Sequence, residues 1–244
     1  MGILERVDDG SLVCTVSILD EFWVLTWAGC LSPFQNELDN FQVKVGVHDS
    51  SLVNSFTSQH KIAKFVKSGT TQRDIALIQL TEPIDFTSDY VNDAQLFDGD
   101  PQTIQLHSPQ FVAGWGLNGR TSFISKTLPR YVVGNILAES YCSLSWNQSF
   151  DSSKDYCFLS STTDKNVPCK GDEGSPLMYQ AIANEQMGIG DRLIQVGLYY
   201  NRNDQCSANS PGLFVDIYQY QSWLTEQMAC AVPGSAHAPD KCPQ

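Results

Sequence analysis

The chain has 244 residues, 42% of them hydrophobic and 11% aromatic, an ordinary composition for a globular core that argues against intrinsic disorder. Its formal net charge is −12, from 15 Lys and Arg residues against 27 Asp and Glu residues. Because nucleic acids and anionic membranes are bound through clustered Lys and Arg, this balance argues against both as general partners.

Short runs of branched and aromatic residues predict β-strands along most of the chain. Clusters of Gly, Asp, Asn, Ser and Pro separate these runs and predict turns. The strands are expected over residues 12–19, 22–26, 41–47, 74–80, 131–137 and 193–200. Many short strands with few helices predict an all-β sandwich or barrel.

One helix is predicted, over residues 218–229, where an apolar stripe is formed by Tyr220, Trp223, Leu224 and Met228. Residues 230–244 are rich in Pro and Ala, so we expect a tail or linker there. No run approaches the ~20 apolar residues of a transmembrane helix, so membrane insertion is not expected.

Eight cysteines form an even set, at positions 14, 30, 142, 157, 169, 206, 230 and 242. None has the Cys-x-x-Cys spacing of a zinc ribbon or redox site, so four disulfides in an oxidising compartment are favoured. The first ten residues lack the apolar core of a signal peptide, so we expect a secreted chain processed from a longer precursor. Asn147 begins an Asn-Gln-Ser triplet and is a candidate glycosylation site. The spacing of His, Asp and Glu offers no metal site, and no cofactor is expected.

Two longer motifs and three shorter ones lie in order along the chain. Residues 23–30 are Trp-Val-Leu-Thr-Trp-Ala-Gly-Cys, and residues 168–177 are Pro-Cys-Lys-Gly-Asp-Glu-Gly-Ser-Pro-Leu. Residues 74–78 are Asp-Ile-Ala-Leu-Ile, residues 114–116 are Gly-Trp-Gly, and residues 211–214 are Pro-Gly-Leu-Phe. The series resembles the trypsin-like serine proteases, whose longer motifs are Trp-Val-Leu-Thr-Ala-Ala-His-Cys and, around the nucleophile, Gly-Asp-Ser-Gly-Gly-Pro.

The resemblance implies an all-β fold with two packed six-stranded antiparallel β-barrels, a C-terminal α-helix, and a site in the cleft between the barrels. It covers residues 1–229, with about 1–97 in the first barrel, about 98–217 in the second and 218–229 in the helix. The family pairing implies the disulfides Cys14–Cys30, Cys142–Cys157 and Cys169–Cys206. Cys230 and Cys242 lie outside that pattern, and they either pair with each other or reach an upstream segment.

The catalytic positions depart from the family pattern. Gly29 stands in place of the general-base histidine and Glu173 in place of the nucleophilic serine, while Asp74 matches the triad aspartate. Hydrolysis in this family needs all three groups, and removing triad members typically lowers turnover about a millionfold. We therefore expect that the chain is not an enzyme and has no catalytic residues.

Substitutes for the missing groups are not expected to act. Ser175 follows Glu173 by two places, and the family geometry points it away from the nucleophile position. Solvated surface side chains, rather than a displaced base, are expected for the four histidines at positions 48, 60, 107 and 237. Without an imidazole at Gly29, Asp74 should accept hydrogen bonds from water or other donors, or carry a raised pKa.

The binding half of the site is altered as well. Gly171 and Glu173 supply the oxyanion-hole equivalents, and the Glu173 carboxylate should either occupy that site or pair with Lys170, which in both cases blocks acyl chemistry. The specificity pocket is degraded, since Val167 at its base offers no charge. Its wall, Ser-Trp-Gly in active relatives, becomes Tyr200, Asn201 and Arg202. The side chain of Arg202 either fills the pocket or swings into solvent.

Activation is also expected to differ. Active relatives insert a newly cleaved N-terminus beside the aspartate that precedes the serine, and that aspartate matches Asp172. The chain begins shortly before Cys14, too late to include such a terminus. Either an upstream segment supplies it, or the loops around Asp172 are zymogen-like or held by local contacts.

The sequence favours a non-catalytic extracellular interaction module or cofactor, in a proteolytic cascade or within a larger mosaic protein. Other extracellular proteins, including proteases and their zymogens, are the expected partners, and the oligomeric state is not predicted. The acidic segments 36–39 and 85–100 are candidates to meet a basic partner, although a solvated face is the favoured interpretation of each. Two alternatives stay open. One is a hydrolase with residual or unusual activity, for which Asp74 and Glu173 offer a carboxylate pair, and the other is a structural matrix or inhibitor-decoy module.

Overall fold

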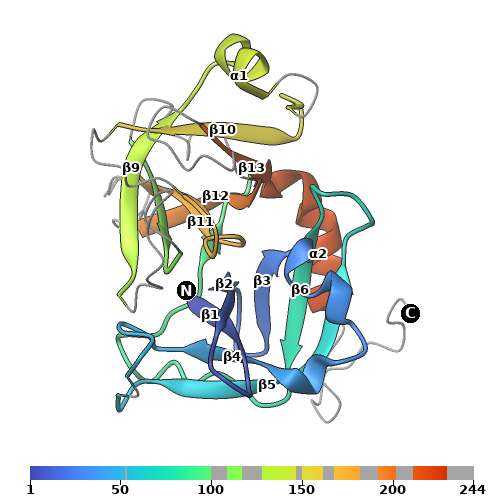
Figure 1. Ribbon diagram of the computed structural model, residues 1–244, viewed down its shortest axis with the longest axis vertical. Helices are drawn as coiled ribbons and strands as arrows, with labels where there is room; N and C mark the ends of the chain where they lie inside the picture. The colour runs from blue at the N-terminus through green and yellow to red at the C-terminus, as the bar shows by residue number, and fades with distance from the viewer. Residues whose placement is uncertain are drawn as a thin grey trace.

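Two β-barrels packed together form the structure (Figure 1). The computed structural model describes residues 1–52, 54–99, 109–116, 128–146, 150–161, 168–181, 192–201 and 211–229. The first barrel is drawn in blue to cyan and the second in green to red, so each barrel comes from one continuous part of the chain.

The first barrel is closed by six antiparallel strands in the order β1–β2–β3–β6–β5–β4. The strands are β1 (Gly2–Arg6), β2 (Leu12–Ile18), β3 (Trp23–Trp27), β4 (Phe41–Val45), β5 (Ser58–Lys67) and β6 (Ile75–Leu80). A buried apolar cluster fills the barrel and includes Leu4, Val16, Val24, Val43 and Ile78. Successive side chains of a strand face opposite sides, so alternate residues supply this core.

The second barrel is closed by β8 (Gln110–Gly114), β9 (Arg130–Ile136), β10 (Asp155–Ser160), β11 (Pro176–Ala181), β12 (Arg192–Asn201) and β13 (Gly212–Asp216). These strands follow the order β11–β8–β9–β10–β13–β12, and β11 pairs again with β12 to complete the ring. A short strand, β7 (Gln95–Leu96), adds to β12 in parallel. The prediction of two six-stranded antiparallel barrels is confirmed, with β7 as an addition to it.

The sequence patterns locate only part of these strands. Each of the six predicted runs lies on a strand, but the patterns do not predict β1, β5, β7, β8, β10, β11 or β13. In β5, only His60 and Ile62 are buried and lysines occupy outward positions, so no continuous apolar run marks the strand. The short strand β7, which pairs with β12, lies just before the barrel boundary predicted at about residue 97.

In the described residues, two α-helices flank the strands. The sequence does not predict α1 (Glu139–Trp146), because Cys142 is its only buried residue while Tyr141 and Leu144 are exposed. At the carboxyl end, a 3-10 turn (Ile217–Tyr220) precedes α2 (Gln221–Met228), so the first turn of the predicted helix is not α-helical.

The helix α2 packs on a core shared by both barrels. Leu224 is buried there, together with Leu25 and Leu77 of the first barrel and Leu198 and Val215 of the second. The two barrels are therefore held together by apolar packing as well as by the polar contacts described below.

Disulfides join distant elements within each barrel region. Cys14–Cys30 links β2 to the turn after β3, and Cys142–Cys157 links α1 to β10, as the family pairing implies. They close loops of 16 and 15 residues, and a chain-entropy treatment gives roughly 3 kcal/mol of stabilisation for loops of this size. Cys169 is disulfide-bonded too.

Several predicted features lie outside the described residues. These are Cys206, Cys230 and Cys242, the candidate glycosylation site Asn147, the pocket residues Val167 and Arg202, His107 and His237, and the tail 230–244.

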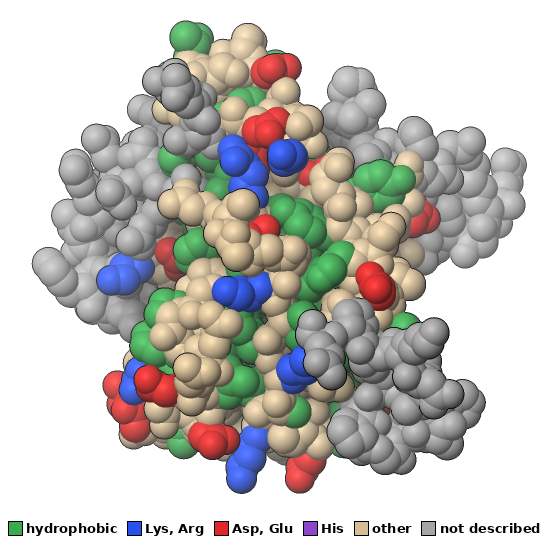
Figure 2. All heavy atoms as spheres, turned by 90° about the vertical axis from the view of Figure 1, so that its right-hand side faces the viewer, with side chains coloured by type: hydrophobic (Ala, Val, Ile, Leu, Met, Phe, Trp, Pro, Cys, Tyr) green, Lys and Arg blue, Asp and Glu red, His purple; other side chains and the backbone are tan. Residues whose placement is uncertain are grey.

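The described part of the chain contains no helix long and apolar enough to cross a membrane. On the face shown in Figure 2, Lys and Arg side chains lie among polar and acidic ones. Among the described residues of that face, no broad basic surface of the kind that binds nucleic acid is seen.

Candidate functional site

The three positions that match the catalytic triad lie on neighbouring elements. Gly29 is in the turn after β3, and Asp74 immediately precedes β6. Because β3 and β6 pair with each other, these ends adjoin, and the Ala28 N–H donates to the Asp74 carbonyl at 3.0 Å. Glu173 lies in the turn before β11, and its carbonyl accepts the Thr15 N–H of β2 at 2.8 Å. The site therefore forms where the two barrels meet.

The Trp27 ring occupies the space in front of Gly29. A Cβ placed on Gly29 would overlap three atoms of the six-membered part of the Trp27 indole. The indole N–H is held by the Gln72 carbonyl at 2.8 Å, so the ring has a fixed orientation. The sequence motif shows that position 29 carries no imidazole, but it does not predict that the Trp27 ring covers this position. The available signal was the family alanine that Trp27 replaces in this chain.

Asp74 is buried, with 6% of its surface exposed, and its carboxylate has protein donors. It accepts hydrogen bonds from the Thr71 N–H and, at 3.4 Å, from the Ser68 hydroxyl. Gly69 packs closely against it, since a Cβ there would lie 2.9 Å from Asp74 Oδ1. The expectation that Asp74 accepts hydrogen bonds from donors other than an imidazole is therefore met by Thr71 and Ser68.

Glu173 places its carboxylate on Gly171, one of the two residues predicted to correspond to the oxyanion hole. Its Oε2 accepts the Gly171 N–H at 2.6 Å, a charge-assisted hydrogen bond. Gly171 has a φ of +93°, a left-handed conformation that favours glycine. The ion pairs between described residues do not include Glu173 with Lys170. Of the two contacts expected for the Glu173 carboxylate, the structure therefore has the one with Gly171 rather than the one with Lys170.

Asp172 is held by local backbone contacts. Its two carboxylate oxygens accept the Gly116 N–H at 2.8 Å and the Cys169 N–H at 2.9 Å. Burial raises the pKa of Asp172 to about 7, with a smaller contribution from the charge of Glu173, although both hydrogen bonds oppose the rise. A Cβ on Gly116 would lie 2.5 Å from the Asp172 carboxyl carbon, so this position needs glycine.

Ser175 is fully buried. Its N–H donates to the Asp172 carbonyl at 2.8 Å, and its own carbonyl accepts the Tyr199 N–H at 2.9 Å. These contacts fix the backbone on both sides of the residue. The hydroxyl is therefore not accessible to a substrate.

Two histidines fall within the described residues, and one differs from expectation. His48 is exposed, but His60 is buried with 6% of its surface accessible. The prediction of a surface side chain at His60 is wrong because β5 alternates and turns this residue inward. Its ring contacts the Ser58 hydroxyl at 2.8 Å and the Glu82 carbonyl at 3.3 Å, and burial lowers its pKa. Neither histidine lines the cavity beside Glu173.

Tyr200, predicted in the specificity-pocket wall, belongs to a buried polar network. Its hydroxyl donates to Asp155 Oδ1 at 3.0 Å, and Arg73 Nε pairs with Asp155 Oδ2 at 2.9 Å. Burial raises the pKa of Tyr200, and the charge of Asp155 raises it further. Asn201 ends β12 opposite Leu213. Because Arg73 lies before β6 and Asp155 begins β10, this ion pair ties the first barrel to the second.

Replacing Arg73 measures how much the Arg73–Asp155 ion pair contributes to the stability of the fold. Arg73→Met leaves Asp155, whose side chain is 0% exposed, without its cation, and we expect the free energy of unfolding to fall by about 3 kcal/mol. Urea unfolding would measure the change. Arg6→Met is the matched control, since Arg6 and Asp8 form an exposed pair and a much smaller loss is expected. Equal losses of unfolding free energy in Arg73→Met and Arg6→Met would contradict the stabilising role assigned to the Arg73–Asp155 ion pair.

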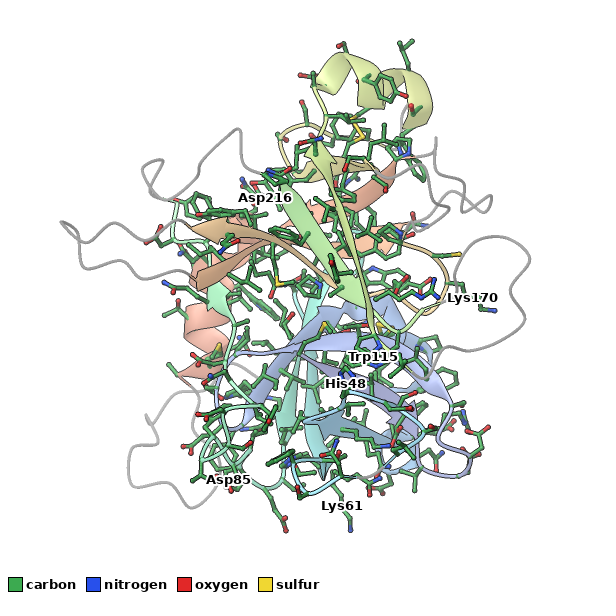
Figure 3. All side chains as sticks on the ribbon, turned by 90° about the vertical axis from the view of Figure 1, so that its left-hand side faces the viewer. His48, Lys61, Asp85, Trp115, Lys170 and Asp216 are labelled. Atoms are coloured by element: carbon green, nitrogen blue, oxygen red, sulfur yellow. A yellow bond between two sulfur atoms is a disulfide. The ribbon has the colours of Figure 1, made fainter. Side chains whose placement is uncertain are left out.

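A half-open cavity of about 530 Å³ lies beside Gly29 and Glu173. Its lining includes Gly29 and Glu173, with apolar walls from Trp27, Trp115 and the Cys14–Cys30 disulfide. Figure 3 shows Trp115 where the barrels meet and Lys170 on the edge of the second barrel. Among the described residues, no group of three or more His, Cys, Asp and Glu side chains is placed to hold a metal ion.

Comparison with known proteins agrees with this architecture. The family model described as Trypsin matches residues 4–224. The platelet-aggregating proteinase PA-BJ of Bothrops jararaca is 25% identical over 91% of this chain and 86% of its own length. The venom plasminogen activator LV-PA of Lachesis muta muta is 25% identical over 91% and 80%, and the serine protease grass of Drosophila melanogaster 24% identical over 92% and 62%. Because the family model covers most of the chain and the two barrels agree with it, the chain belongs to the trypsin family of serine proteases.

Proposed function

We propose that this chain is a non-catalytic member of its family that acts by binding other extracellular proteins. The observation that carries the proposal is the Glu173 carboxylate on the Gly171 N–H. Acyl transfer needs that N–H for the oxyanion that develops on the substrate carbonyl. A carboxylate in its place takes the hydrogen bond and adds a negative charge where the transition state would carry another.

The general-base position supports the same proposal. Gly29 carries no imidazole, and Trp27 fills the room that one would need. Ser175, which carries the hydroxyl nearest to Glu173 in the sequence, is buried. Activation of a hydroxyl nucleophile requires a base within hydrogen-bond reach, and the histidines of the described region lie elsewhere.

The setting of this role is inferred from the disulfides and the family. Disulfide bonds favour an oxidising compartment, so we propose a secreted chain, processed from a longer precursor and a candidate for glycosylation at Asn147. Two relatives are named as a plasminogen activator and as a serine protease. Proteases or zymogens of an extracellular cascade are the proposed partners, and the chain would serve as a cofactor or as an inactive module.

Turnover of a broad panel of peptide and ester substrates tests the proposal. Wild-type chain is expected to hydrolyse none of them faster than Asp74→Asn does, because Gly29 supplies no imidazole base and Glu173 no hydroxyl nucleophile at the triad positions. Asp39→Asn, an exposed carboxylate away from the site, controls for preparation effects. Hydrolysis that is lost in Asp74→Asn or Glu173→Gln but kept in Asp39→Asn would overturn the proposal and favour the carboxylate-pair hydrolase.

A further inference from the structure

An exposed aromatic pair lies on the first barrel, away from the cavity. Phe56 and Tyr90 are 41% and 72% exposed, and their ring centroids are 4.3 Å apart. The two residues come from separate loops, before β5 and after β6. Leu52 in the first loop and Phe86 in the second are also exposed. Exposed apolar side chains that contact each other, as the rings of Phe56 and Tyr90 do, are a common mark of a binding site.

The loop that carries Tyr90 is anchored at both ends. Ile84 and Val91 are 3% and 4% exposed and belong to the core of the first barrel. The Ile84 N–H also donates to the Glu21 carbonyl at 2.7 Å. Between these anchors, the Tyr90 N–H donates to the Ser88 hydroxyl at 3.2 Å. The exposed position of Tyr90 is therefore set by buried contacts on either side of it.

The loop that carries Phe56 is fixed as well. The Phe56 N–H donates to the Asn54 side chain at 2.8 Å, and the Thr57 hydroxyl donates to the Gly46 carbonyl at 3.3 Å. Gly46 has a φ of +68°, and a Cβ there would overlap the Phe56 carbonyl. Glycine at this position lets the loop close, which holds Phe56 against Tyr90. The pair is thus preorganised, and a partner would lose little ordering entropy on binding it.

The segment that carries Tyr90 has charges of one sign only. Residues 81–93 contain four carboxylates and no Lys or Arg: Glu82, Asp85, Asp89 and Asp93. Asp85 and Asp89 flank Phe86 and Tyr90 in sequence and are exposed. The Thr87 N–H donates to Asp85 at 2.8 Å and lowers the pKa of that carboxyl, so it stays charged at neutral pH. An aromatic face beside carboxylates is complementary to Lys and Arg, which contact both.

We propose that the Phe56–Tyr90 pair, with Asp85 and Asp89, is a docking surface for a basic segment of a partner protein. Lys or Arg side chains would lie over the rings and pair with the two carboxylates. Figure 3 places Asp85 on the outer side of the first barrel, apart from Trp115 and Lys170. None of the four residues lines the cavity, so the surface does not depend on whether the cleft is catalytic.

The test uses a fluorescent peptide of alternating Arg and Ser as the probe. A peptide with citrulline in place of Arg keeps the shape and removes the charge. Fluorescence anisotropy is expected to show binding of the Arg peptide, weakened about tenfold in Phe56→Ala/Tyr90→Ala and less in Tyr90→Phe, which keeps the ring. Asp85→Asn/Asp89→Asn should weaken binding most at low ionic strength, because salt screens exposed charges.

Matched controls separate this surface from general attraction to an acidic chain. Tyr131→Ala removes a tyrosine that is 71% exposed on β9, and Glu37→Gln/Asp39→Asn removes two exposed carboxylates elsewhere. Both controls are expected to bind the Arg peptide as wild type does, and thermal unfolding would verify that every variant is folded. No binding, equal binding of the citrulline peptide, or equal losses in test and control variants would overturn the proposal.

Discussion

Introducing the family's histidine and serine, by Gly29→His with Glu173→Ser, is expected to produce no detectable hydrolysis. The new imidazole would collide with Trp27, whose ring lies where any side chain at Gly29 must begin. The carboxylate of Asp74 is also engaged by the Thr71 N–H and the Ser68 hydroxyl rather than left to orient an imidazole. Loss of a working triad typically costs about a millionfold in turnover, and the correct residue types alone would not recover it.

Adding Trp27→Ala to that double variant tests the explanation. Removal of the ring opens the space at position 29, so the triple variant should be labelled by a serine-reactive phosphonate faster than the double variant. The double variant and wild type should both remain at background, and Trp27→Ala alone is the matched control. Labelling of the double variant at the rate of an active protease would contradict the role assigned to Trp27.

Stability is expected to fall as the pH rises from about 4 to about 7, in part because of Asp172. Burial raises its pKa in the folded chain from 3.8 to about 7, so the folded state binds this proton more tightly than the unfolded state. The favourable contribution is present at low pH and is lost as the pH rises through 7. The difference between the two pKa values corresponds to about 4 kcal/mol.

Asp172→Asn isolates that contribution. Urea unfolding at several pH values should give a slope between pH 4 and 7 that is smaller in Asp172→Asn than in wild type, by an amount of order 4 kcal/mol over the interval. A constant offset from altered hydrogen bonds to Gly116 and Cys169 does not change the slope. Asp39→Asn, an exposed carboxyl, should keep the wild-type slope. Identical slopes in wild type and Asp172→Asn would contradict the contribution to pH-dependent stability assigned to Asp172.

The fold could be predicted to a useful level because the family motifs appear in order. Those motifs place Gly29, Asp74 and Glu173 without coordinates, and they imply two barrels that the structure contains. Individual strands are harder to predict from the residue pattern. In β5, for example, outward-facing lysines interrupt the apolar pattern. The error at His60 follows from the missed strand, because a residue's side of a barrel is known only once its strand is known.

The chain's own sequence determined which chemical groups stand at the catalytic positions, since residue identity at a recognised motif needs no coordinates. Tertiary structure alone decided what surrounds those groups. Trp27 covers Gly29 with its indole N–H bound to the Gln72 carbonyl, which is distant in the chain. The contacts of Gly116 with Asp172 and of Phe56 with Tyr90 likewise join loops that are separate in the chain. Such contacts arise from the closure of the barrels and from side-chain packing, which a local pattern of residues does not encode.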